Sequence, residues 1–144
     1  MNGVPRTYDL NKSVLTFGTV NITGYAAGEA ATFELEGVDW AMNKGSHGEV
    51  SFVAQHNPTG KATVRVMKGN PVNAALAALA STSMLTGASF PLFFVDILGG
   101  DQVIAPFCKI EKIPKLSTGD GDYPVEWVFL MAQPEITHGT AIPV

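Results

Sequence analysis

Polar and apolar residues alternate over three stretches in the first half of the chain. In residues 32–36, 49–55 and 61–67, apolar side chains recur at every second position, and β-branched residues are frequent. A period of two is typical of strands that are buried on one face only. We therefore expect three strands of an antiparallel sheet, with one apolar face and one hydrophilic face.

The alternation also predicts which side chains point inward. The apolar set expected in the core is Phe33, Leu35, Val50, Phe52, Ala54, Ala62, Val64 and Val66. The hydrophilic set expected on the other face is Thr32, Glu34, Glu36, Glu49, Ser51, Gln55, Lys61, Thr63 and Arg65. Residues 56–60, which include a proline and a glycine, predict a hairpin turn between the last two strands.

A long polar segment, residues 37–48, separates the first two of these strands. It is far longer than a tight hairpin requires, so we interpret it as a loop. Its side chains include a tryptophan and a methionine but nothing that resembles a catalytic set. We expect it to contact another protein through Val38, Asp39, Trp40, Met42, Asn43, Lys44, Ser46 and His47.

One helix is predicted, over residues 71–86. Asn70 can cap the free amide groups, and Pro71 at the first helical position loses no hydrogen bond. Gly87 is a typical helix terminator. The side chains at helical spacing are Val72, Leu76, Leu79 and Ser83, with small alanines between them. Such a thin helix can pack closely on a sheet or close the end of a barrel.

The remaining strands are expected on both sides of this helix. Residues 13–23 predict a strand kinked at Gly18, and residues 90–98 predict a strand covered on both faces. Residues 102–113 predict a strand that is bulged or at an edge because of Pro106. Residues 123–132 predict a last strand with one aromatic-rich face. The fold class is therefore mainly β, a two-sheet β-sandwich or barrel of about seven antiparallel strands with one α-helix.

Composition indicates one domain with few charged residues. The chain has 144 residues, of which 46% are hydrophobic and only 15% charged, and its net charge is −4. That charge content is low for a small soluble monomer and favours a surface hidden in an assembly. We expect a single domain, 1–144, with arms at 1–12 and 133–144. No signal peptide, no basic field for nucleic acid and no membrane span are expected.

The sequence motifs predict neither an enzyme nor a metal or cofactor site. The single cysteine, Cys108, excludes an internal disulfide, and its strand-like context favours a buried, inert thiol. His47, His56 and His138 lack metal-ligand spacing. Residues 119–122 lack the pattern of a calcium loop. No phosphate-binding loop or nucleophile elbow is present.

The segment Tyr8-Asp-Leu-Asn-Lys-Ser-Val-Leu-Thr-Phe-Gly18, with this order of elements, resembles the tail tube proteins of contractile-tailed bacteriophages. These are similar in fold to the secreted tube proteins of type VI secretion systems. The resemblance covers residues 8 to about 135. It implies hexameric rings that stack into a hollow tube and conduct DNA during ejection. Segment 37–48 matches the position of the family's ring-stacking loop.

The same resemblance implies a channel wall and a set of partners. The residues expected to face the lumen are Glu34, Glu36, Glu49, Ser51, Thr63 and Arg65, a wall of mixed charge that is net negative. Expected partners are further copies of the chain, the tail sheath, the baseplate and terminator proteins, and transiently the tape measure protein and double-stranded DNA. No membrane binding is expected. The location implied is the virion tail, after synthesis in the host bacterial cytoplasm.

Two other functions stay open at this stage. A β-sandwich that binds a small ligand or carbohydrate could use Trp40 as its platform. A secreted tube protein of a type VI secretion system would share the fold. The state of assembly separates the first alternative from a tube, because a binding module is expected to remain a monomer.

Overall fold

The computed structural model describes residues 6–7, 13–26, 30–36, 40–54, 59–119, 123–139 and 142–143. The strands before the helix are β1 (Arg6–Thr7), β2 (Ser13–Phe17), β3 (Val20–Asn21), β4 (Ala31–Leu35), β5 (Trp40–Lys44), β6 (Val50–Ala54) and β7 (Thr59–Val66). Helix α1 (Pro71–Thr86) is followed by β8 (Phe90–Asp96), β9 (Gln102–Ile110), β10 (Val125–Ala132), β11 (Glu135–Thr137) and β12 (Ile142–Pro143). The fold is mainly β with one helix, as predicted.

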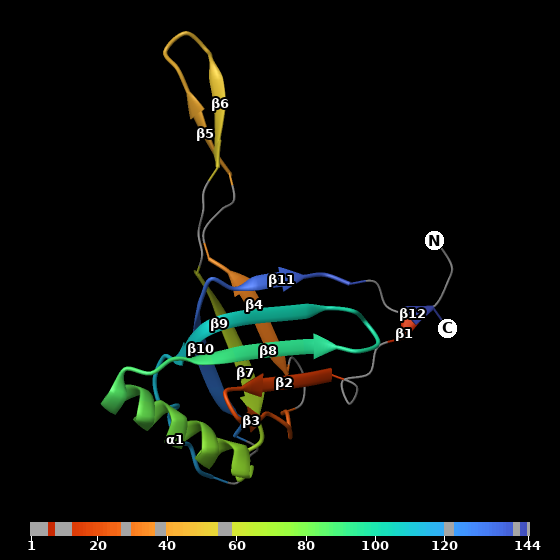
Figure 1. Ribbon diagram of the computed structural model, residues 1–144, viewed down its shortest axis with the longest axis vertical. Helices are drawn as coiled ribbons and strands as arrows, with labels where there is room; N and C mark the ends of the chain where they lie inside the picture. Colours follow the sequence, from red (N-terminus) through yellow and green to blue (C-terminus); the bar gives the residue numbers. More distant parts are fainter. Residues whose placement is uncertain are drawn as a thin grey trace.

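One antiparallel sheet forms the body of the molecule (Figure 1). Its strand order is β3-β2-β8-β9-β10-β7-β4, and β11 pairs with β9 beside this path. The sheet curls so that its two ends face each other. Phe17 of β2 lies 4.9 Å from Phe129 of β10, and Phe33 of β4 lies 4.9 Å from Phe94 of β8, measured between ring centroids. The result is the two-layered arrangement of a sandwich built from a continuous sheet.

The core fills the space inside the curled sheet. It consists of Leu15, Phe17, Ile22, Ala62, Val64, Val66, Leu76, Leu92, Val103, Ala105, Cys108, Trp127, Phe129 and Met131. Alternation explains the contributions of β7 and β10, where every second residue is buried. The predicted inward positions Ala62, Val64 and Val66 are confirmed, each with no exposed surface.

Helix α1 covers one end of the curled sheet and has the predicted bounds. The side chain of Asn70 accepts a hydrogen bond from the amide of Val72, and Gly87 ends the helix at φ 74°. The amide group of Asn70 also donates to the carbonyl of Thr23 at 2.5 Å, which ties the helix start to the segment after β3. No helix among the described residues has both the length and the apolar character needed to cross a bilayer.

Strand β9 contains the bulge that Pro106 predicts. Its register with β8 shifts between Phe90, which pairs with Cys108, and Leu92, which pairs with Ala105. Pro106 and Phe107 are therefore both exposed, while Ala105 and Cys108 both reach the core. Strand β8, predicted to be covered on both faces, is covered on one: Phe93 is 37% exposed, and Leu92 is buried.

The predicted terminal arms contain paired strands. Strand β11 pairs with β9, with Ile136 opposite Val103, within the range 133–144. Strands β1 and β12 pair with each other. Most of range 1–12 lies outside the described residues.

The largest difference from the prediction concerns residues 40–54. Residues 40–44, predicted to lie in a loop, form strand β5, and this strand pairs with β6 rather than joining the main sheet. Val50, Phe52 and Ala54, predicted in the core, are exposed instead. Leu35, also predicted inward, is 46% exposed at the end of β4. Alternation correctly predicts a strand for β6, but it does not reveal which surface covers its apolar side chains.

Candidate functional site

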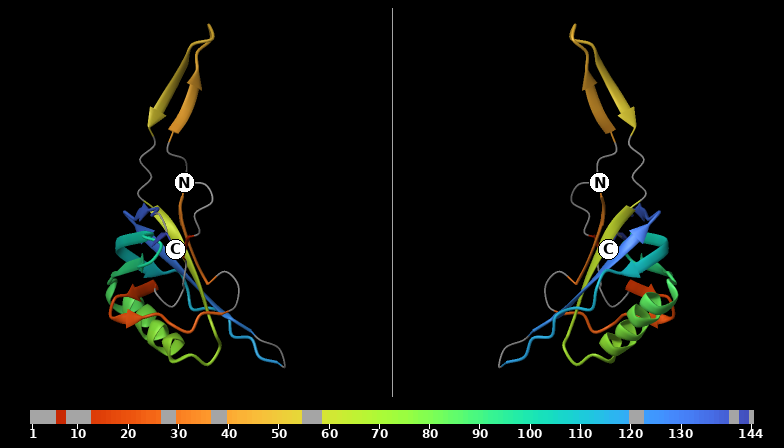
Figure 2. Two further views of the ribbon diagram at one scale, coloured as in Figure 1. Left: turned by 90° about the vertical axis from the view of Figure 1, so that its right-hand side faces the viewer. Right: turned by 90° about the vertical axis from the view of Figure 1, so that its left-hand side faces the viewer.

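The β5–β6 hairpin stands away from the body at one end of the molecule's longest axis (Figures 1 and 2). Among the described strands, β5 and β6 pair only with each other. The register places Trp40 opposite Ala54, Met42 opposite Phe52, and Lys44 opposite Val50. Because directly opposed residues of an antiparallel pair share a face, this register defines the two faces of the hairpin.

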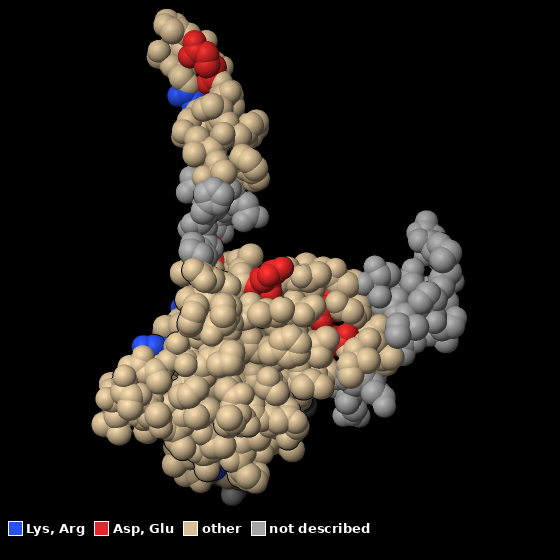
Figure 3. All heavy atoms as spheres, viewed as in Figure 1, with Lys and Arg blue, Asp and Glu red and all other residues tan. Residues whose placement is uncertain are grey.

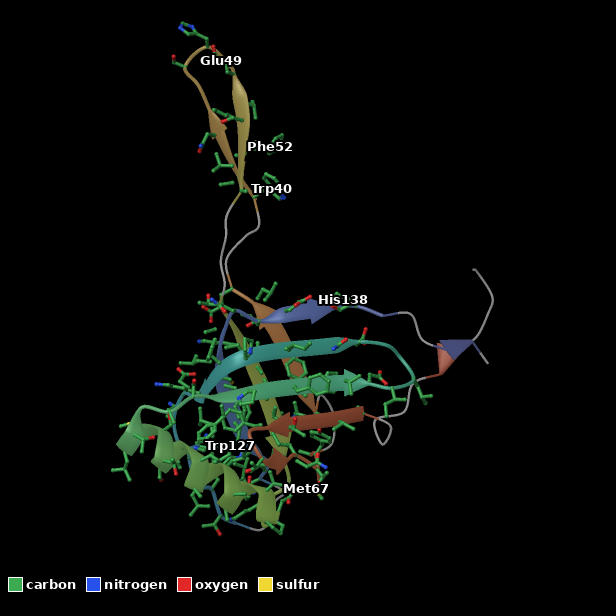
Figure 4. All side chains as sticks on the ribbon, in the orientation of Figure 1. Trp40, Glu49, Phe52, Met67, Trp127 and His138 are labelled. Atoms are coloured by element: carbon green, nitrogen blue, oxygen red, sulfur yellow. The ribbon has the colours of Figure 1, made fainter. Side chains whose placement is uncertain are left out.

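One face of the hairpin is apolar and uncovered. We call Trp40, Met42, Val50 and Phe52 the hairpin apolar face; their side chains are 63%, 56%, 50% and 70% exposed. Figure 4 labels Trp40 and Phe52 on this projecting element. Ala54 and Lys44 lie on the same face. The opposite face carries Ala41, Asn43, Ser51 and Val53, and lacks side chains as large as those of Trp40 and Phe52. Large apolar side chains gathered on one face and left open to water indicate a surface that meets a partner.

The tip of the hairpin is a compact polar turn. The amide of Gly45 donates to the carbonyl of Glu49 at 2.7 Å, and Gly48 adopts a φ of 87° that favours glycine. Lys44, Ser46, His47 and Glu49 are all exposed there. Of the residues predicted for a stacking loop, Trp40, Met42, Asn43, Lys44, Ser46 and His47 therefore lie together on the hairpin. Val38 and Asp39 lie outside the described residues.

A second candidate surface is the outer face of β4, β7 and β10, away from the core. Glu34 is opposite Lys61, and Glu126 is opposite Arg65, so carboxylates and cations alternate across the strands. Lys61 Nζ lies 4.0 Å from Glu36 Oε1, with both side chains more than two-fifths exposed. An exposed pair of this kind contributes at most about 1 kcal/mol. Four predicted wall residues lie on this face: Glu34, Glu36, Thr63 and Arg65.

The remaining two predicted wall residues lie elsewhere. Glu49 and Ser51 belong to the projecting hairpin and not to the outer face of β4, β7 and β10. The prediction grouped them because residues 49–55 show the same alternation as residues 61–67. The structure separates these two segments because β6 pairs with β5 and β7 pairs with β4 and β10.

The outer face of β2, β8 and β9 is apolar, a feature that the sequence reading did not identify as a surface. Val14, Phe93, Ile104 and Phe107 are 36%, 37%, 37% and 54% exposed there. Figure 3 shows few charged atoms over these strands and over α1. Helix α1 contains no charged residue, and Met84 and Leu85 near its end are each 87% exposed. The predicted bulge at Pro106 was the feature of the sequence that could have indicated this surface, because a bulge turns Phe107 outward.

The described ionisable groups indicate no activated nucleophile. Burial raises the pKa of the Cys108 thiol to about 12, and burial also raises the pKa of Tyr25. A reactive thiol requires the opposite shift, toward the thiolate. Cys108 is 1% exposed, as the sequence predicted for a structural cysteine. No group of three or more His, Cys, Asp or Glu side chains suited to a metal ion occurs among the described residues.

No protein-family model and no curated protein matches the sequence. Solved structures do match, over nearly the whole chain. One is the tube-terminating cap of the anti-feeding prophage, with a TM-score of 0.65, 8% identity, and coverage of 96% of this chain and 96% of that chain. The chain has a tail tube-like fold, which it shares with proteins of contractile injection systems.

Two further structures of this fold come from the PVC extracellular contractile injection system in its extended state. A chain of the sheath–tube complex matches with a TM-score of 0.63 and 8% identity, and covers 92% of each chain. A chain of the sheath/tube terminator matches with a TM-score of 0.64 and 9% identity, covering 94% of this chain and 99% of that chain. The predicted resemblance to contractile tail tube proteins is thus confirmed at the level of fold.

Proposed function

We propose that this chain is a structural subunit of the inner tube of a contractile tail. In this proposal, hexameric rings stack through the hairpin into a hollow tube that lies inside a sheath. The observation that carries the proposal is the hairpin apolar face, which projects from a tail tube-like body and is left uncovered by the described residues. A face of this kind in a stable subunit needs a partner to remove it from water.

The two outer faces of the body support the same arrangement. The outer face is hydrophilic over β4 and β7 and suits a water-filled channel, whereas β10 adds Val128 and Leu130 beside Glu126. The apolar outer face of β2, β8 and β9 suits contacts with neighbouring proteins. Closing subunits into a ring would also satisfy sheet edges that otherwise risk uncontrolled pairing.

The channel wall would carry mixed charge. Glu34, Glu36 and Glu126 share the outer face of β4, β7 and β10 with Lys61 and Arg65, so the described wall has one more carboxylate than cations. A net negative wall repels phosphates and lets DNA slide without adhering. We therefore propose that the tube belongs to a virion tail and that its cargo is double-stranded DNA.

The test is assembly with and without the hairpin. The purified chain should form rings or tubes in negative-stain micrographs at high concentration. Replacing residues 40–54 with a short glycine-serine linker should leave a folded body but abolish long tubes. The whole hairpin is replaced because deleting only 40–47 would leave β6 without its pairing strand. A variant that still forms long tubes would show that the hairpin does not join rings.

A tube-terminating protein is the second candidate, because two of the three structures described above are a cap and a terminator. A terminator binds the end of an existing tube, so its own rings should not stack. Tubes formed from the purified chain alone would exclude it. Rings that stay single, yet shorten or block a growing tube when added to it, would favour it. A strict monomer with affinity for a glycan would instead favour the carbohydrate-binding alternative.

A further inference from the structure

A groove lies at the end of the body opposite the hairpin. It runs between the first turns of α1 and the segment that connects β9 to β10, and its volume is about 550 Å³. Its apolar side chains include Ala74, Ala77, Ile113, Leu116 and Trp127. We call this depression the α1 groove. Figures 1 and 2 both place α1 and the hairpin at opposite ends of the long axis.

Hydrogen bonds hold the walls of the α1 groove in place. The indole Nε1 of Trp127 donates to Asn73 Oδ1 at 2.9 Å, which fixes the helix wall over the sheet. The Nζ atom of Lys68 donates to the carbonyl of Ser117 at 2.5 Å, which fixes the opposite wall. A groove that already exists in the free subunit requires little reorganisation to accept a partner.

The rim of the α1 groove is apolar and basic. Leu116 is 83% exposed and Ile113 is 54% exposed, so the wall presents large side chains to solvent. Among the described residues, Lys68 and Lys115 are the charged ones that line it, and Glu126 lines the neighbouring depression with the same two lysines. The hairpin matches this surface with its apolar face and with the exposed carboxylate of Glu49 at its tip, beside Lys44.

We propose that the α1 groove receives the hairpin of a second copy of this chain from the adjacent ring. The inference rests on the proposed function, because it names the receptor for the stacking hairpin. Two different surfaces at opposite ends of one subunit make a heterologous contact, and such contacts repeat head to tail without closing on themselves. The hairpin apolar face enters the α1 groove, and Glu49 approaches Lys68 and Lys115 at its rim.

Cysteine cross-linking tests the contact directly. Phe52→Cys and Leu116→Cys, combined in one chain and oxidised after tube formation, should give a ladder of disulfide-linked oligomers. Each single variant should give none, because Cys108 is buried. Mixing the two single variants should give dimers only. Tubes that form without this cross-link, while Phe52→Cys cross-links to Phe107→Cys instead, would overturn the inference and leave the proposed function intact.

A matched pair of helix variants provides an independent test. Ala74 lines the α1 groove, whereas Ala78, one turn later and also exposed, does not line it. Ala74→Arg should give rings that fail to stack, because it fills the groove and adds charge beside Lys68. Ala78→Arg should stack as the wild type does. Equal stacking by both variants would overturn the inference. Absence of rings and tubes in the wild type would remove the proposed function and this inference together.

Discussion

At the scale of single residues, a partly buried hydrogen bond between side chains joins the helix to the sheet. Trp127 is 2% exposed, and its Nε1 group donates to Asn73 Oδ1 across the interface between β10 and α1. The amide of Asn73 also donates to the carbonyl of Met67 at 3.2 Å, just before the helix starts. Asn73 therefore satisfies the indole and fixes the approach of the helix at the same time.

Replacing Asn73 with leucine should destabilise the fold. The indole Nε1 group would remain buried without an acceptor, at a cost of about 1–3 kcal/mol. For a domain of this size, that loss corresponds to a fall in Tm of roughly 2–12 °C. Thermal unfolding followed by circular dichroism measures it. The double variant Asn73→Leu with Trp127→Phe removes both partners of the hydrogen bond. Its loss of stability should be smaller than the sum of the losses of the two single variants. A loss equal to that sum would contradict this.

The buried thiol of Cys108 makes stability depend on pH in the alkaline range. The unfolded chain loses this proton near the ordinary thiol pKa of 9.0, whereas the folded protein keeps it up to about 12. Between these values the unfolded state binds fewer protons, so stability falls as pH rises, by up to about 1.4 kcal/mol per pH unit from this group. Below pH 9 the contribution of this group is constant.

Urea unfolding of the wild type and of Cys108→Ala at several pH values measures this dependence. The alanine variant is expected to be less stable at pH 7, because it leaves a small cavity. Its deficit should shrink above pH 9, since it lacks the thiol. Tyr25 titrates in both proteins, so its effect cancels in the difference. A deficit that stays constant from pH 7 to pH 11 would contradict the assignment.

At the scale of elements, the helix could be predicted to the residue and the hairpin could not. The signals that bound α1, namely Asn70, Pro71 and Gly87, act through neighbouring backbone groups and need no information about the rest of the fold. The strand character of β6 was equally visible in its alternation. Its location was not, because apolar side chains at every second position look the same whether the partner is a core or another molecule.

The two faces of the hairpin should differ in their effect on assembly. Met42→Ser with Phe52→Ser removes apolar surface that the proposed contact buries, so the critical concentration for tube formation should rise at least tenfold. Asn43→Ala with Ser51→Ala changes the opposite face and should raise it less than threefold. Sedimentation of tubes over a concentration series measures both. Equal effects would show that the register does not decide which face docks.

Both hairpin variants should leave the body as stable as the wild type. The described hairpin strands pair only with each other, so the core loses nothing when their side chains change. A two-stranded hairpin is marginally stable alone, and hydrogen exchange of its amides should be fast in the unassembled subunit and slow in tubes. This comparison separates a defect of folding from a defect of docking.

At the scale of the whole molecule, different strands of the curled sheet present outer faces of different polarity. The outer face is hydrophilic over β4 and β7 and mainly apolar over β2, β8 and β9, where Lys109 is the exposed charge of the strands. Strand β10 lies between these regions and carries Glu126 with Val128 and Leu130. Alternation alone predicted the first face but not the second, because the bulge in β9 reverses the direction of its side chains after Ala105. The candidate wall was therefore predictable in part. Glu49 and Ser51, predicted for the same wall, lie on the hairpin instead of this face, because alternation does not show which strands pair.

Reversing charge on the proposed wall should affect transport and not assembly. Glu34→Lys with Glu36→Lys converts a net negative face into a positive one, which should attract phosphates and slow DNA ejection. Tubes should form as in the wild type, because neither residue belongs to the hairpin or to the α1 groove. Ejection kinetics and infectivity measure the effect. Unchanged values would argue against the placement of these residues in a DNA channel.

The location of the hairpin at one end of the long axis has a consequence for growth. In the proposed tube, one terminus exposes only hairpins and the other exposes only α1 grooves, so the polymer has a direction. The two termini then have different rates of subunit addition. A protein that starts or stops elongation has to recognise a single kind of terminus, and tube length can be controlled from that terminus alone.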